Sequence, residues 1–210
     1  FTLGLLRLDV QTDATRWFPP GNAVRDDYEA IRVQLSGISP VNVVIASRDG
    51  SPLTDPEVVR AIDRLAAHLE SLPTVGKAVS LADPLRQIHG GFQGDPALPL
   101  PDARPLIEQY LLLLESVEPI HDLVTGDRRA ANVVLRADDN GSGPLLAVGE
   151  EAARWWRSHG VPGTEVRATG IMYEFARAED EIALGQLRGL ALAVVAITLV
   201  LALALRRVSL

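Results

Sequence analysis

The sequence predicts an α+β fold in which two strand–helix–strand (βαβ) units are followed by one membrane-spanning helix. Two observations predict the units: an extended apolar run, an amphipathic helix and a second extended run occur in residues 41–81 and again in residues 129–169. The third observation is residues 189–205, which carry no charge. Two such units can share one antiparallel sheet with their helices on one face, which is the ferredoxin-like (split βαβ) plan.

The segment before the first unit is predicted to contain a strand and a helix. Leu6–Val10 alternates apolar and charged residues, as a strand does. Trp17 and Phe18 allow two interpretations, a membrane-interface anchor or a pair packed into the core, and the core is the commoner place for such a pair. Asn22 can cap a helix over residues 23–35. The apolar positions that recur at helical spacing in this helix are Val24, Tyr28, Ile31 and Leu35.

The first unit begins with the apolar run Val41–Ala46. Thr54 or Asp55 can cap the next helix, with Pro56 at its first position, where a missing N–H costs little. A third extended run covers residues 75–81. The helix between the two runs is predicted to bury the stripe Val58, Ile62, Leu65, Ala66 and Leu69.

The second unit has the same order of elements. Residues 129–137 are predicted as a strand, residues 145–159 as a helix that Gly160 ends, and residues 164–169 as a further strand. A continuous helix is then predicted from about Tyr173 into the apolar run. The unit therefore leads directly into the membrane-spanning segment.

Residues 84–120 separate the two units and are predicted to form a helical and loop insertion. A short helix begins at Asp83-Pro84, an irregular loop rich in glycine and proline begins at Gly90, and a second helix covers about residues 105–115. A connection of this length in a compact domain usually has a function or is mobile.

The apolar run 189–205 fits a bilayer. About 17 residues make a helix about 25 Å long, and a spanning helix needs about 17–25 residues. Arg206-Arg207 follows the run, whereas Glu179-Asp180-Glu181 precedes it. Positive charge is retained in the cytoplasm. We therefore expect residues 1–183 to form an extracytoplasmic domain and residues 184–210 to form the transmembrane helix and its cytoplasmic end.

Small residues recur every four positions along this helix, at Gly185, Gly189 and Ala193. Inside lipid, small residues let a second helix approach closely. The spacing predicts a packing face for further transmembrane helices of the same protein, and the alternative is a lone anchor rich in alanine and glycine. The span contains no ionisable residue, so it cannot relay protons by itself.

Several kinds of chemistry have no signal in the sequence. The net charge is −7 and no basic patch stands out, so nucleic acid is not an expected partner. The chain has no cysteine, and its four histidines are scattered without metal-binding or nucleophile patterns. The acidic stretch Asp138-Asp139-Asn140-Gly141 lacks the ligand alternation of a calcium loop and is interpreted as a solvated turn. We expect no enzymatic activity, no metal and no cofactor.

Four motifs follow one another along nearly the whole chain. They are Trp17-Phe18-Pro19 with Tyr28-Glu29-Ala30-Ile31; Thr74-Val75-Gly76-Lys77-Ala78-Val79-Ser80-Leu81-Ala82-Asp83-Pro84-Leu85-Arg86; Gln109-Tyr110-Leu111-Leu112-Leu113-Leu114-Glu115; and Ala168-Thr169-Gly170 before a helix that ends in Arg206-Arg207-Val208-Ser209. In order and spacing they resemble the resistance-nodulation-division (RND) superfamily, in its MmpL/hydrophobe-exporter branch.

The resemblance implies a porter domain on the periplasmic side of the bacterial inner membrane. It implies a transporter that exports lipids or other hydrophobic molecules, is driven by the proton gradient and works as a homo-oligomer. The family's proton-relay carboxylates lie in helices outside this chain, so no functional residue carries over. The alternative functions are an extracytoplasmic ligand-sensing domain of a signalling protein and a membrane-anchored hydrolase. Trp155, Trp156 and Phe92 could line a substrate path or pack in the core.

Overall fold

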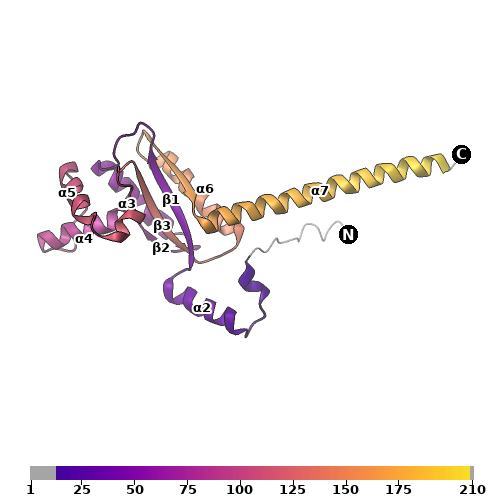
Figure 1. The fold of residues 1–210 in the computed structure, drawn as a ribbon, viewed down its shortest axis with the longest axis horizontal. Helices are drawn as coiled ribbons and strands as arrows, with labels where there is room; N and C mark the ends of the chain where they lie inside the picture. The colour runs from indigo at the N-terminus through magenta and orange to yellow at the C-terminus, as the bar shows by residue number, and fades with distance from the viewer. Residues whose placement is uncertain (1–12, 209–210) are drawn as a thin grey trace.

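The computed structural model describes residues 13–208 (Figure 1), so the predicted strand Leu6–Val10 lies outside the described residues. Its strands form one antiparallel sheet in the order β2-β3-β1-β4, which confirms the α+β prediction. The strands are β1 (Ser39–Ser47), β2 (Val75–Val79), β3 (Ala130–Ala137) and β4 (Thr164–Thr169).

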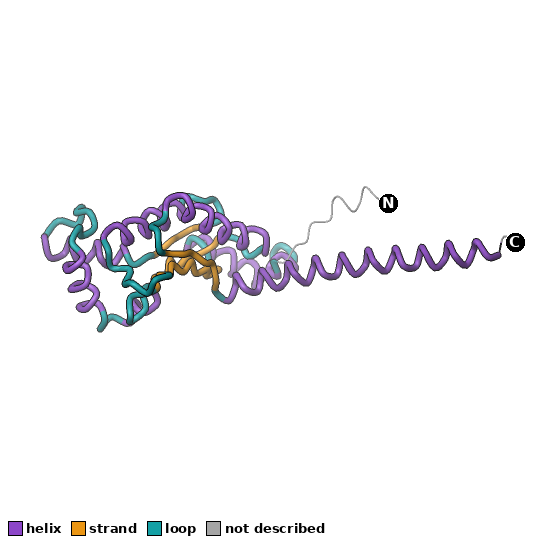
Figure 2. Tube along the Cα trace, turned by 90° about the horizontal axis from the view of Figure 1, so that it is seen from above, coloured by secondary structure: helices purple, strands orange, loops and turns teal. Residues whose placement is uncertain are grey.

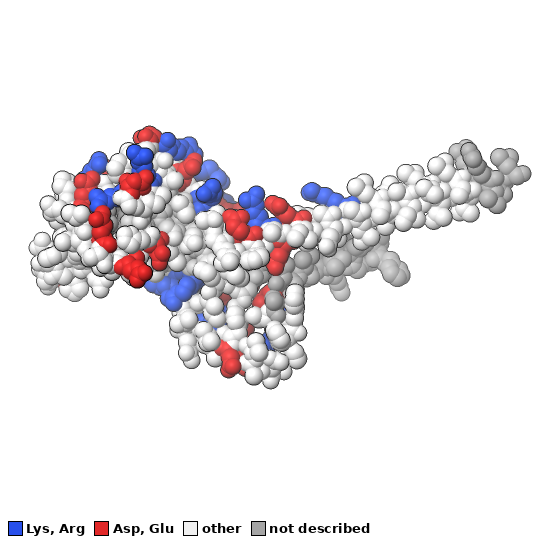
Figure 3. Space-filling model, viewed as in Figure 1, with Lys and Arg blue, Asp and Glu red and all other residues white. Residues whose placement is uncertain are grey.

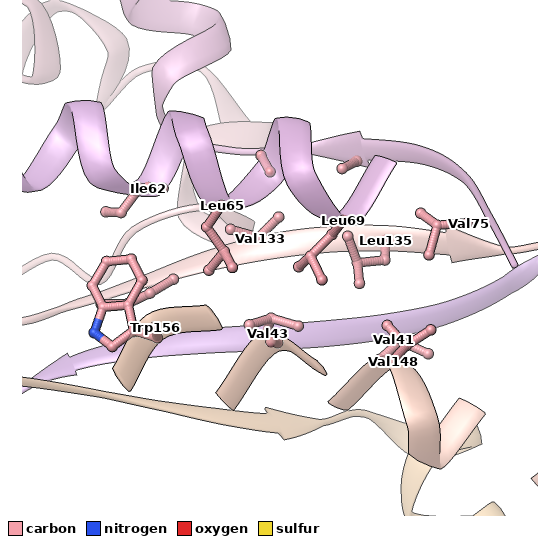
Figure 4. Close-up of a cluster of buried hydrophobic side chains, with 14 of the residues drawn as sticks. Val41, Val43, Ile62, Leu65, Leu69, Val75, Val133, Leu135, Val148 and Trp156 are labelled. Carbon is pink, nitrogen blue, oxygen red and sulfur yellow. The ribbon is translucent and has the colours of Figure 1, made fainter. Parts of the chain in front are cut away.

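Two helices join the strands in pairs and cover one face of the sheet. Helix α3 (Pro56–Glu70) connects β1 to β2, and helix α6 (Ser142–His159) connects β3 to β4. Alternate residues of β1 are buried, because successive side chains of a strand point to opposite faces. Figure 4 shows the resulting core, in which side chains of both helices meet the same face of the sheet. Its labelled members are Val41, Val43, Ile62, Leu65, Leu69, Val75, Val133, Leu135, Val148 and Trp156.

The start of α3 follows its sequence signals. The carboxylate Oδ1 of Asp55 accepts a hydrogen bond from the backbone N–H of Glu57 at 2.8 Å, so Asp55 is the cap, and Pro56 is the first helical residue. All five residues of the predicted stripe are buried. The helix is thus fixed to the sheet by the apolar face that its sequence marks.

The insertion is more helical than the sequence indicates. It contains α4 (Ala82–Gln93), α5 (Arg104–Leu114) and η2 (Glu118–Asp122). The expected loop at Gly90 is wrong: the helix continues to Gln93, and Gly94 ends it with φ 71°. A Cβ on Gly90 would lie 2.8 Å from the carbonyl oxygen of Asp95, so this glycine lets the returning chain touch the helix.

The insertion also has an apolar core of its own. Val59, on the side of α3 turned away from the sheet, packs into it. Residues 84–120 are therefore an ordered layer against α3. The other buried members of this core are Leu81, Ala82, Leu85, Leu100, Ile107, Tyr110, Leu111, Ile120 and Val124.

Helix α2 (Ala23–Leu35) has the predicted bounds. Asn22 caps it, since its side-chain oxygen accepts from the N–H of Val24 at 3.0 Å. None of its residues, Ala23 to Leu35, is buried, and Figure 1 shows it standing apart from the sheet. Of the four apolar positions that recur at helical spacing, Val24 is 62% exposed, Ile31 48% and Leu35 48%, whereas Tyr28 is half-buried.

The short helix η1 (Ala14–Trp17) precedes α2 and corrects a second expectation. Trp17 is 72% exposed and Phe18 is 42% exposed, so this aromatic pair does not pack into the domain core. We call η1 and α2 together the η1–α2 arm. Its apolar side chains are exposed because the contacts that hold the arm to the domain are polar.

Helix α7 (Ile171–Val208) follows β4 directly and leaves the rest of the molecule as a single rod (Figures 1 and 2). Within residues 13–208 it is the one helix long and apolar enough to cross a membrane, over Ile171–Leu205. Figure 3 shows acidic and basic side chains over the domain and the near part of α7, and a charge-free surface along residues 189–205.

Candidate functional site at the base of the long helix

The first turns of α7 are part of the domain core. Ala176 is 2% exposed, and Met172 and Tyr173 pack against the core cluster. Gly170, with φ 112°, turns the chain from β4 into the helix, a conformation that glycine adopts without strain. Its carbonyl accepts the N–H of Glu174 at 2.9 Å, which starts the helical hydrogen bonding. The long helix therefore begins inside the folded domain.

Gly149 is the closest point of contact at this joint. A Cβ at this position of α6 would lie 2.6 Å from both Cε2 and Oη of Tyr173 and 2.7 Å from Cβ of Ala168. Real Cβ atoms do not approach other atoms so closely, so α6, β4 and α7 can meet here only around a glycine. Burial raises the pKa of the Tyr173 phenol, so the group stays neutral.

Sequence reasoning missed Gly149, although a signal was present. A glycine in the middle of a helical pattern costs roughly 1 kcal/mol relative to alanine, and when it is kept there it usually has a packing reason. The contact partner could not be found in this way, because Tyr173 is 24 positions away in the chain and belongs to a different element.

A polar network joins the η1–α2 arm to the loop between β3 and α6. The guanidinium of Arg32 bridges Glu29 at 2.8 Å and Asp138 at 2.6 Å. The side chain of Asn140 binds both Tyr28 and Ser39. Residues 138–141 were expected to be a solvated turn, but the structure uses them as the attachment point of α2. The polar side of α2 faces the domain for this reason.

A cavity of about 210 Å³ lies within this network. Arg16 reaches Asp139 at 3.5 Å across it. Burial alone would raise the pKa of the Asp13 carboxyl, but its hydrogen bonds to Thr15 outweigh burial and hold the pKa below its usual value. The lining contains two arginines and four carboxylates, and each arginine bridges two of the carboxylates, so negative charge is in excess around the cavity.

The predicted packing residues Gly185, Gly189 and Ala193 lie on one face of α7, since they are spaced by four. An added Cβ at Gly185 or Gly189 would meet no atom of the described residues within 4 Å. Ile182, three positions before Gly185, is 58% exposed on the same side. The structure therefore leaves this face open, and its role in helix packing stays a prediction.

The second face of the sheet is not part of the core. The side chain of Asn132 donates to Asn42 at 3.2 Å and to the carbonyl of Asp122 at 3.0 Å, while its own Oδ1 is buried without a hydrogen-bond partner among the described residues. The remaining side chains of this face are half-buried or exposed. They are Lys77, Val79, Ala130, Val134, Arg136, Pro40, Val44, Ala46, Glu165, Arg167 and Thr169.

The three aromatic residues named from the sequence lie in different places. Trp156 is 5% exposed in the core, and its indole N–H donates to Thr164 at 3.0 Å. Trp155 is partly buried beside the same cluster. Phe92 is 65% exposed on α4, where its ring stacks on Tyr110 with centroids 5.8 Å apart. Phe92 therefore lies on the insertion, whereas Trp155 and Trp156 are neighbours on α6 with ring centroids 6.3 Å apart.

Within residues 13–208 no group of three histidine or acidic side chains is placed to hold a metal ion. At the base of α7, close packing joins the folded domain to a long apolar helix. This joint can transmit a movement of the domain to the helix. No family model matches this chain, and no curated protein matches it at a significant level.

Proposed function

We propose that this chain is the porter domain and the following transmembrane helix of an RND-type, MmpL-like transporter that exports lipids or other hydrophobic molecules. One observation carries the proposal: α7 starts in the domain core at Tyr173 and Ala176 and continues without a break through a stretch that can span a bilayer. A movement of the domain against the bilayer must therefore move α7, and a movement of α7 must shift the domain.

The topology supports the finer fold assignment, the ferredoxin-like (split βαβ) plan. In the order β2-β3-β1-β4, the two strands of each βαβ unit are separated by one strand of the other unit. Strand β3 lies between β1 and β2, and strand β1 lies between β3 and β4. Both connecting helices pack on the same face. Residues 84–120 then stand as an insertion between the units, and residues 1–183 as one extracytoplasmic domain.

Charge and helix length support the placement in the bacterial inner membrane. Residues 184–205 would cross the bilayer, with Arg206-Arg207 retained on the cytoplasmic side and the domain in the periplasm. The face of Gly185, Gly189 and Ala193 would pack on the remaining transmembrane helices of the same transporter. The uncovered face of the sheet would meet further porter elements, or copies of the chain in a homo-oligomer, around the route of the apolar substrate.

A signalling protein would also join an extracytoplasmic ligand-sensing domain to a spanning helix. The sequence motifs that resemble the exporter family favour transport. An export measurement separates the two, because a sensor moves no hydrophobic molecule across the membrane.

The test interrupts α7 between the domain and the bilayer. Cells that make the full-length protein are loaded with the lipophilic dye Nile red, and the rate of dye loss is compared with that of cells lacking the protein. The double variant Glu181→Gly with Ile182→Pro breaks the helix, because proline lacks the N–H and clashes with the preceding turn. The matched control is Glu181→Ala with Ile182→Ala, which keeps the helix.

We expect the Gly-Pro variant to reach the membrane but to lose export, and the Ala-Ala variant to keep most of it. Equal export by the two variants would refute coupling through α7. Equal dye loss from cells with and without the wild-type protein, for Nile red and for a fluorescent phospholipid, would refute the transporter and leave the sensing domain.

A further inference from the structure

A cluster of titratable and aromatic side chains lies at the contact between α3 and α6, away from the joint with α7. His68, in the last turn of α3, meets Glu151 of α6, with His68 Nε2 and Glu151 Oε1 2.8 Å apart. The indole of Trp155 stacks with both imidazoles nearby: its centroid is 5.8 Å from that of His68 and 4.8 Å from that of His159, each with an interplanar angle of 23°. We call His68, Glu151, Trp155 and His159 the His–Trp stack.

Several charged groups lie around the two imidazoles of the stack. Both histidines lie in the last turn of their helices, where the helix dipole favours a cation. Glu151 contributes a carboxylate, and its hydrogen bond to His68 lowers the pKa of that carboxyl. Two arginines add positive charge near the imidazoles and act against the effect of Glu151. They are Arg154, which pairs with Glu151, and Arg64, one turn before His68 on α3.

We propose that the His–Trp stack is a pH-responsive clamp that tightens the contact between α3 and α6 when the medium around the domain becomes more acidic. Histidine side chains titrate in the range of about pH 5 to 8. An imidazolium has two N–H donors and a positive charge, so its bond to Glu151 becomes charge-assisted. A cation within about 6 Å of an indole ring is also attracted to the ring face, which strengthens the stacking of His68 on Trp155 between α3 and α6 and the stacking of His159 on Trp155 within α6.

The carboxylate sets the lower limit of the response. Because the pKa of Glu151 is held below its usual value, the carboxylate stays charged through the range in which histidines gain their protons. The contact strengthens as the pH falls through that range, and weakens again only when Glu151 itself takes up a proton.

The clamp changes how firmly α6 is held against α3, and α6 is also the helix that packs against the base of α7. Glu151 and Trp155 follow Gly149 by less than two turns of α6, so the stack and the joint with Tyr173 share one rigid element. Only this consequence, that the external pH regulates the coupling of the domain to the membrane helix, rests on the proposed function. The clamp itself is a property of the α3–α6 contact.

The first test measures protonation beside Trp155. The full-length protein in detergent micelles is titrated from about pH 8 to pH 5, and tryptophan emission is recorded; a protonated imidazole quenches a stacked indole. We expect emission to fall over the range of about pH 5 to 8 in which histidine side chains take up protons. The fall should disappear in Trp155→Phe and in the double variant His68→Gln with His159→Gln. It should persist in the matched double variant His89→Gln with His121→Gln, whose histidines lie outside the stack.

The second test measures the clamp. Amide hydrogen exchange, corrected for its intrinsic pH dependence, is compared at about pH 7.5 and pH 5.5 in the last turn of α3 and in the middle of α6. We expect exchange about two- to fivefold slower at the lower pH, the effect of a cation–π contact at a partly exposed site. The double variant His68→Gln with His159→Gln should remove this difference.

Emission that is independent of pH, a fall that the double stack variant leaves intact, or equal protection at the two pH values would each overturn the clamp. Neither measurement involves transport. A protein that shows the response but exports nothing would refute the transporter alone, and an exporter without the response would refute the clamp alone.

Discussion

The joint between α6 and α7 makes a strong prediction for the substitution Gly149→Ala. In a bare helix this change stabilises by roughly 1 kcal/mol, because alanine is the better helix former. At position 149 the new Cβ would lie 2.6 Å from the Tyr173 ring and 2.7 Å from Cβ of Ala168. The tip of the tyrosine ring can swing, since it is only half-buried. Ala168 cannot, because it is 8% exposed and paired with Val43 in the sheet.

The two effects have opposite signs, and the clash wins. Overpacking of a well-filled site costs about 1–3 kcal/mol. With the helix gain subtracted, we expect Gly149→Ala to lower the free energy of unfolding by up to about 2 kcal/mol. For a domain of this size that corresponds to a melting temperature lower by up to about 8 °C.

The assay is thermal unfolding of the full-length protein in detergent, followed by tryptophan emission. Gly91→Ala is the matched control, since Gly91 is also helical but has no atom within 4 Å of an added Cβ; it should stabilise by up to about 1 kcal/mol. Combining Gly149→Ala with Tyr173→Ala should give a coupling energy of about 0.5–3 kcal/mol, because both residues share one contact. If Gly149→Ala were as stabilising as Gly91→Ala, the tight joint would be disproved.

Two further predictions concern the edge of the sheet. Gly76→Ala should lower the free energy of unfolding by at least about 3 kcal/mol in denaturant titrations, because the new Cβ would overlap the backbone carbonyl oxygen of Ser36 at 1.6 Å; a loss below about 1 kcal/mol would contradict this packing. Glu70→Gln should flatten the acid dependence of stability. Burial alone would raise the pKa of Glu70, but the N–H of Ala78 and the neighbouring lysine outweigh burial and hold the pKa below its usual value of 4.5. A lowered folded-state pKa contributes stability that is present above pH 4.5 and is lost as the pH falls through the folded value. The melting temperature of the wild type should therefore drop more steeply than that of Glu70→Gln between about pH 5 and pH 3, and parallel curves would count against this role.

Local signals sufficed for the bounds of two elements. Helix α2 covers Ala23–Leu35 and strand β4 covers Thr164–Thr169, as predicted, because caps, glycines and apolar periodicity act on neighbours in the chain. The same signals failed at Gly90, where two consecutive glycines usually end a helix. Here the helix continues to Gln93, and the close approach of Asp95 to Gly90 exists only after the chain has folded back.

The orientation of α2 is a second feature that local sequence signals do not determine. Its apolar spacing is real, but a spacing does not say which side meets the domain. The side with Tyr28 and Arg32 faces inwards, because the loop at residues 138–140 offers hydrogen-bond and ion-pair partners there. Those partners lie about 110 positions further along the chain, beyond the reach of any local pattern.

The sequence alone determined the fold class, the buried stripe of α3 and the length and apolar character of the final helix, since each depends on the order of residues over one or two turns or strands. The tertiary structure decided the strand order, the outward apolar side of α2, the joint at Gly149 and the meeting of His68 with Trp155. These features are contacts between elements far apart in the chain. Such contacts depend on packing and on the pairing of buried polar groups, which become defined only when the elements are brought together.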